Sequence, residues 1–220
     1  MFLFVVDEVT RYQRAYLLEA KGDATNYLIK LINEGRTLFK QFQLQRLHSD
    51  RGGQAASTEL ETYYCAKEGY ILQTTNGYSP QENGVVERAN GVVLPRIRAL
   101  QFATAMPVQL WGEALLHVAD TFNKLPTQPP GMEPPHERLY GAAPDLNVLR
   151  TWGCFAWVYI PPESRRRKEK LKPRAHLSLL LRYSYSTKGY KFLGFLTCQA
   201  VTAQGGNAHL RKDFTADGDF

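Results

Sequence analysis

Two acidic residues stand where a metal-dependent phosphoryl-transfer site would need them. Asp50 follows a strand predicted over Gln43–His48 and precedes the turn at Gly52-Gly53, and Glu87 lies near the start of a predicted helix. Mg²⁺ prefers carboxylate oxygens, and the protein must place them close together on rigid elements. The pattern alone is weak evidence, because an Asp before two glycines commonly forms a turn and a Glu in a first helical turn complements the helix dipole.

The elements around these acids predict a mixed α/β domain. An apolar run at residues 2–6 and alternating apolar residues in the next strand predict a hairpin at the start of the chain. Helical spacing of apolar residues from Val86 to Leu100 predicts the helix that carries Glu87. Pro95 should kink that helix, because it lacks an N–H group. The other predicted elements are strands at Phe2–Val6, Gln13–Glu19 and Tyr70–Thr74, a helix from Asp23 to just before Gly35, and a short helix at Ser57–Lys67.

A proline-rich segment divides the sequence in two. Six of the twelve prolines fall between residues 125 and 144, so this segment should hold no regular helix or central strand, and we expect a linker there. The predicted strands beyond it are Cys154–Ile160, Leu177–Arg182 and Tyr190–Phe195. We therefore predict a core over residues 1–140 and a small β module over residues 147–215. Trp111 and Trp152 are expected in cores or domain contacts.

The charge is concentrated in the second part. The whole chain carries 27 Lys and Arg against 21 Asp and Glu, a net charge of +6. Residues 1–150 hold 15 basic and 16 acidic residues, and residues 151–220 hold 12 and 5, so the excess lies in the last third. Such a balance favours a nucleic-acid partner for the β module.

Compartment and membrane contact follow from simpler signals. Three cysteines without paired spacing favour a reduced, intracellular or nuclear setting over secretion. The apolar run at residues 1–6 is too short to span a bilayer and is interpreted as a buried strand, so no membrane partner is expected.

Two sequence blocks resemble the signature motifs of retroviral and retrotransposon integrases. These are HSDRGGQ at residues 48–54 and YSPQENGVVERAN at residues 78–90, and 36 residues separate Asp50 from Glu87. The opening hairpin, the Trp-x-Glu-Ala motif at residues 111–114 and the stretch from Leu149 onward are most similar to the Copia (Ty1) class of LTR retrotransposons. This resemblance implies a ribonuclease H-like mixed sheet flanked by helices, followed by a basic SH3-like β module.

The resemblance also implies roles for the acids. Asp50 matches the second acid of a D,D,E triad and Glu87 the third, and together they would bind Mg²⁺ or Mn²⁺. The first acid belongs to a strand before the opening hairpin, so we expect the first strand of the sheet to be missing here. Asp7 matches a later turn and is not that acid. One carboxylate short, the chain should bind metal weakly and turn over poorly or not at all.

DNA is the partner that the resemblance implies, both as element ends and as target, with a homo-oligomer as the acting form. Tyr78, Asn83 and Arg88 match the loop and helix start that approach DNA ends, although a solvated polar loop explains them equally well. The basic run is the second predicted contact, with a solvated loop or a nuclear-localisation patch as alternatives. Its residues are Arg165, Arg166, Arg167, Lys168, Lys170, Lys172 and Arg174.

Two functions remain open from the sequence. The first is DNA integration by polynucleotidyl transfer, and the second is a catalytically inactive, nucleic-acid-binding remnant of a transposon polyprotein. The reading frame upstream of Met1 distinguishes them, because a further strand with an Asp favours the first and a stop codon favours the second.

Overall fold

A computed structural model describes seven ranges of the chain: residues 1–40, 44–49, 71–74, 84–126, 133–165, 171–184 and 187–211. The chain divides into two compact units. The first contains residues 1–8 and 14–91, and the second contains residues 9–13 and 92–220.

The first unit begins with the predicted hairpin. Strands β1 (Phe2–Val6) and β2 (Gln13–Leu17) pair with each other, as alternation in the sequence predicted. Helix α1 (Asp23–Leu38) buries Leu28 and Ile32 against Leu3, Val5 and Leu47. The helix was expected to end before Gly35 but continues to Leu38. A helical glycine costs only about 1 kcal/mol, which is too little to end a helix that is held by packing.

Strands β3 (Arg46–Ser49) and β4 (Ile71–Thr74) form a separate parallel pair. Ser49 is opposite Thr74 in the register, so both strands end at the same edge. The bounds of β3 lie within three residues of the prediction, and those of β4 within one. The helix predicted at residues 57–67 lies outside the described residues.

Helix α4 (Gly84–Thr104) is long and carries Pro95 in its interior. Gly91 loses the hydrogen bond that residue 95 would donate to its carbonyl, because proline has no N–H. The division between the two compact units falls at the same place, between Gly91 and Val92. Beyond it, Val93 and Ile97 are buried at helical spacing, in agreement with the predicted apolar face.

Two further helices precede the β sheet. Helix α5 (Trp111–Lys124) contains a long run of buried residues, and α6 (Pro135–Tyr140) follows the proline-rich segment. The expectation that residues 125–144 hold no regular helix was wrong for α6. Pro135 occupies its first turn, where a missing N–H costs nothing, and Gly141 ends it at φ +70°.

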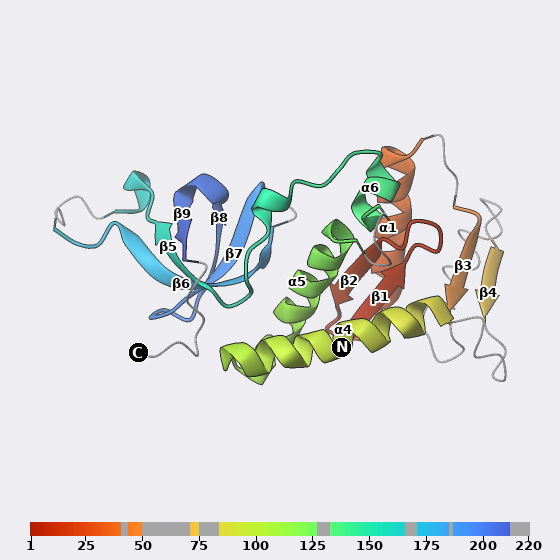
Figure 1. The fold of residues 1–220 in the computed structure, drawn as a ribbon, viewed down its shortest axis with the longest axis horizontal. Coiled ribbons are helices and arrows are strands. Elements are labelled where there is room, and N and C mark those ends of the chain that lie inside the picture. The colour runs from red at the N-terminus through yellow and green to blue at the C-terminus, as the bar shows by residue number, and fades with distance from the viewer. Residues whose placement is uncertain are drawn as a thin grey trace. The chain divides into compact units, whose positions relative to one another are not determined.

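The described strands β5–β9 form an antiparallel sheet in the order β8-β7-β6-β5-β9 (Figure 1). Their bounds are β5 (Phe155–Tyr159), β6 (Ala175–Tyr183), β7 (Gly189–Gly194), β8 (Ala200–Gln204) and β9 (Ala208–Leu210). The first three confirm the predicted strands. The last two were not predicted, because strands of three to five residues with small and polar side chains carry little apolar alternation.

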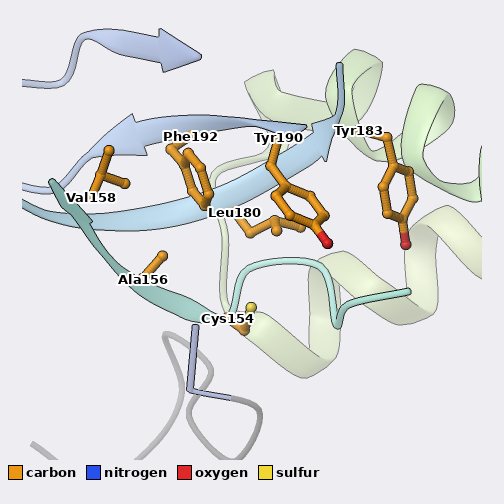
Figure 2. Packing of buried hydrophobic residues seen from close by; sticks show 7 residues of the cluster. All are labelled: Cys154, Ala156, Val158, Leu180, Tyr183, Tyr190 and Phe192. Carbon is orange, nitrogen blue, oxygen red and sulfur yellow. The ribbon is translucent and has the colours of Figure 1, made fainter. Parts of the chain in front are cut away.

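One face of this sheet holds the core of the β module. Figure 2 shows seven side chains gathered between the strands, with Leu180 and Phe192 fully buried among them. The set is Cys154, Ala156, Val158, Leu180, Tyr183, Tyr190 and Phe192. The Tyr190 hydroxyl donates to the Val148 carbonyl at 2.9 Å, so the segment before the sheet is fastened to its core. Trp152 is fully buried, as predicted, and burial raises the pKa of the Cys154 thiol to about 11.

No helix within the described ranges combines the length and the apolar content needed to cross a bilayer.

Candidate nucleic-acid interface

The two predicted metal-binding acids lie next to regular elements. Glu87 is exposed in the first turn of α4. Ser49 is the last residue of β3, and Asp50 follows it in the sequence but lies outside the described residues. The structure therefore gives no distance between the two carboxylates, and their pairing stays a prediction.

Of the three residues predicted to contact DNA ends, the structure describes one. Arg88 is exposed beside Glu87 on α4. Tyr78 and Asn83 lie outside the described residues.

A metal site needs several donor side chains close together. Among the described residues, no three His, Cys, Asp or Glu side chains gather closely enough to hold a metal ion. Glu87 offers hard oxygen donors of the kind that Mg²⁺ prefers, but it belongs to no such group of three among the described residues. No reaction step through a metal follows from these residues.

The basic run is described at its two ends. Arg165 follows a short 3-10 turn at Pro162–Ser164, and Lys172 and Arg174 are exposed just before β6 begins. The Ile160 N–H donates to the Arg174 carbonyl at 2.8 Å, so this loop begins and ends at the same place. Arg166, Arg167, Lys168 and Lys170 lie outside the described residues.

Arg165 has a fixed position at the start of this loop. Its Nε and Nη2 atoms donate to the Ile160 carbonyl at 2.9 and 2.6 Å. Its guanidinium carbon lies 4.7 Å from the centre of the Tyr159 ring, in a cation–π arrangement. The loop therefore brings a cation and an exposed aromatic ring together at the end of β5.

A second polar cluster, which the sequence did not predict, joins α5 to the sheet. Glu113 accepts from Arg182 Nε at 2.8 Å through Oε2 and from Lys191 Nζ at 2.5 Å through Oε1. The three side chains are only 15 to 25% exposed. The Trp-x-Glu-Ala motif marks Glu113 in the sequence, but nothing local identifies partners 69 and 78 residues away.

The same face of α5 buries a histidine against the sheet. His117 stacks on Tyr183 with ring centres 5.0 Å apart, and Lys124 Nζ lies 4.7 Å from the centre of the same ring. Burial, with a smaller contribution from Lys124, lowers the pKa of His117 to about 3. Burial also lowers the pKa of Lys124 and raises that of Tyr183. His117 is therefore neutral at physiological pH.

Known proteins are similar to this chain over the sheet and over most of its length. The family described as "Retroviral polymerase SH3-like domain" matches residues 154–200, which include β5, β6 and β7. The tobacco "Retrovirus-related Pol polyprotein from transposon TNT 1-94" is 29% identical over 192 residues, which is 86% of this chain. The chain is similar to the integrase region of retrotransposon Pol polyproteins. The integrase-region resemblance predicted from the two motifs is thus confirmed.

Further matches agree with this assignment. The Arabidopsis thaliana "Retrovirus-related Pol polyprotein from transposon RE1" is 26% identical over 212 residues, or 96% of the chain. The chain spans only 14% of the length of each of these two relatives.

The fold has a counterpart among solved structures. A chain of the cryo-EM structure of the simian T-cell lymphotropic virus intasome in complex with PP2A regulatory subunit B56 gamma matches with a TM-score of 0.50. That match has 17% sequence identity and covers 95% of this chain and 71% of the other. The predicted fold class, a mixture of helices and sheet with an SH3-like β module, is confirmed.

Proposed function

We propose that this chain takes part in DNA integration by a Copia-type retrotransposon, binding DNA through its basic β module. Asp50 and Glu87 would provide two of the three acids of a D,D,E site, with Mg²⁺ or Mn²⁺ as the cofactor. The observation that carries the proposal is the similarity of nearly the whole chain to transposon Pol polyproteins. A homo-oligomer on DNA would be the acting form.

The described cations support the DNA-binding part of the proposal. Lys172 and Arg174 are exposed at one end of the loop between β5 and β6, and Arg165 is held at the other. Cations at the two ends of this loop can contact a phosphate backbone without reading sequence. We expect duplex binding whose affinity falls steeply as salt concentration rises.

Fluorescence anisotropy with a labelled duplex tests this part. Replacing Lys172 and Arg174 together by Ala should make the negative slope of log affinity against log salt shallower by about 2, since each phosphate contact contributes about −0.9. The charge-matched control replaces Lys30 and Lys40, exposed lysines of the first unit, and should leave the slope unchanged. Equal slopes for both double variants would contradict a contact between these cations of the β module and DNA.

A strand-transfer assay tests the catalytic part. Asp50→Asn and Glu87→Gln should each abolish strand transfer with Mg²⁺ or Mn²⁺, because each removes one of the acids that the resemblance implies. Product that is unchanged in both variants would contradict these roles. DNA binding without product in any longer version of the chain would favour the inactive, nucleic-acid-binding remnant.

A further inference from the structure

Strand β5 presents aromatic side chains to solvent on one of its faces. Ala156 and Val158 point into the core of the β module, and the residues that alternate with them point the other way. Trp157 and Tyr159 are 46% and 44% exposed. Two large aromatic rings two residues apart on one strand therefore stand side by side on an open face.

The neighbouring strands complete this face without covering it. His209 of β9 and Leu177 of β6 are the register partners of Trp157 on either side. Ala175 is the partner of Tyr159, and its methyl group covers little of the ring. The exposed imidazole of His209 adds a flat, polar side chain beside the indole.

Positive charge borders the aromatic face at the Tyr159 end. The guanidinium group of Arg165 lies over the Tyr159 ring, fixed by its two bonds to the Ile160 carbonyl. Arg174 is next to Ala175, the register partner of Tyr159, and Lys172 precedes it. Charge and aromatic surface therefore meet at one end of β5.

We propose that Trp157 and Tyr159 form a stacking site for unpaired bases of single-stranded DNA. Unpaired bases expose flat faces that stack on aromatic rings, while their backbone is attracted to the adjacent cations. Duplex DNA hides its base faces and can use only the cations. The bordering charge favours a polyanion over an apolar protein partner. This inference rests on the proposed DNA-binding function and specifies the form of DNA that this face prefers.

The test compares labelled oligo-dT of about 20 nucleotides with a duplex of similar length, both by fluorescence anisotropy with the full chain. Trp157→Ala with Tyr159→Ala should weaken oligo-dT binding by roughly 10- to 100-fold, and duplex binding by less than about twofold. The salt dependence of oligo-dT binding should stay the same, because no cation is removed. Trp157→Phe with Tyr159→Phe should retain most of the affinity, because stacking surfaces remain.

The matched control is Phe102→Ala, which removes a 90% exposed aromatic ring from α4 and should change neither affinity. Unchanged oligo-dT binding in the Ala pair, or equal losses for duplex and oligo-dT, would overturn the stacking site while leaving DNA binding intact. Wild-type chain that binds neither DNA would instead overturn the proposed DNA-binding function. Unchanged oligo-dT binding with a dimer that dissociates in the Ala pair, seen by sedimentation, would assign the face to self-association.

Discussion

Replacing Glu113 should weaken the packing of α5 on the sheet and so lower the free energy of unfolding. Its carboxylate accepts two charge-assisted hydrogen bonds, at 2.8 Å from Arg182 and 2.5 Å from Lys191. Replacing it by Ala removes both bonds and leaves two neighbouring cations without their shared anion. Within the described residues, this is the contact through which α5 holds both β6 and β7 by charge.

The size of the effect follows from burial. Exposed ion pairs contribute about 0.2 to 1 kcal/mol, and breaking a fully buried pair costs about 3 to 5 kcal/mol. The three side chains are 15 to 25% exposed, closer to the buried limit but still partly screened by solvent. We therefore expect Glu113→Ala to lower the free energy of unfolding by about 2 kcal/mol. Glu113→Gln should cost about half as much, because the amide oxygen still accepts one bond.

Urea unfolding followed by tryptophan fluorescence measures this loss. All three tryptophans, at positions 111, 152 and 157, belong to the second unit, so the signal reports on the unit that contains Glu113. Glu163→Ala is the matched control, because it removes an exposed carboxylate from the same unit and should cost less than about 0.5 kcal/mol.

A double-mutant cycle then isolates the pair. Glu113→Ala and Arg182→Ala should be non-additive by about 1 kcal/mol or more, since each removes the other's partner. Additive losses, or a Glu113→Ala effect no larger than that of Glu163→Ala, would refute the view that this cluster stabilises the packing of α5 on the sheet.

Three other predictions concern the same chain. Because burial lowers the pKa of His117 to about 3, the unfolded chain binds a proton below about pH 6.5 that the folded chain does not. Stability should therefore fall by about 2 kcal/mol between about pH 8 and pH 5, and His117→Phe should flatten that decrease in urea unfolding curves. Asn123 accepts from the Gln13 N–H at 2.7 Å and donates to the Gln13 carbonyl at 2.8 Å while nearly fully buried. Asn123→Ala should cost about 2 kcal/mol, and no loss in the same unfolding assay would contradict the role of this contact. Pro95→Ala should stabilise α4 by restoring the hydrogen bond to Gly91, raising the thermal midpoint in circular dichroism, and a lower midpoint would show that Pro95 fits its site better than Ala.

Local patterns were enough to predict the elements that carry the site. A short apolar run predicted β1, alternation predicted β2, and strand-like composition with a turn at Lys188-Gly189 predicted β5, β6 and β7. Helical spacing predicted α4 with Glu87 in its first turn. These predictions succeeded because burial of one face leaves a period of two or of 3.6 in the sequence.

The errors have local causes of their own. Gly35 did not end α1, because packing of Leu28 and Ile32 outweighs the small cost of a helical glycine. The proline-rich segment still contains α6, because a proline in the first turn of a helix sacrifices no hydrogen bond.

The sequence by itself determined the kind of protein, since the two motif blocks, their spacing and the basic run are all readable along one chain. Only the tertiary structure decided which side chains meet. Glu113 lies 69 residues from Arg182, and the stacking of Arg165 on Tyr159 depends on a loop that returns to Ile160. The exposure of Trp157 likewise depends on the register of three strands. Contacts between distant residues leave no periodic pattern in the sequence. They depend on how the helices and strands pack together, whereas periodicity depends only on which face of each element is buried.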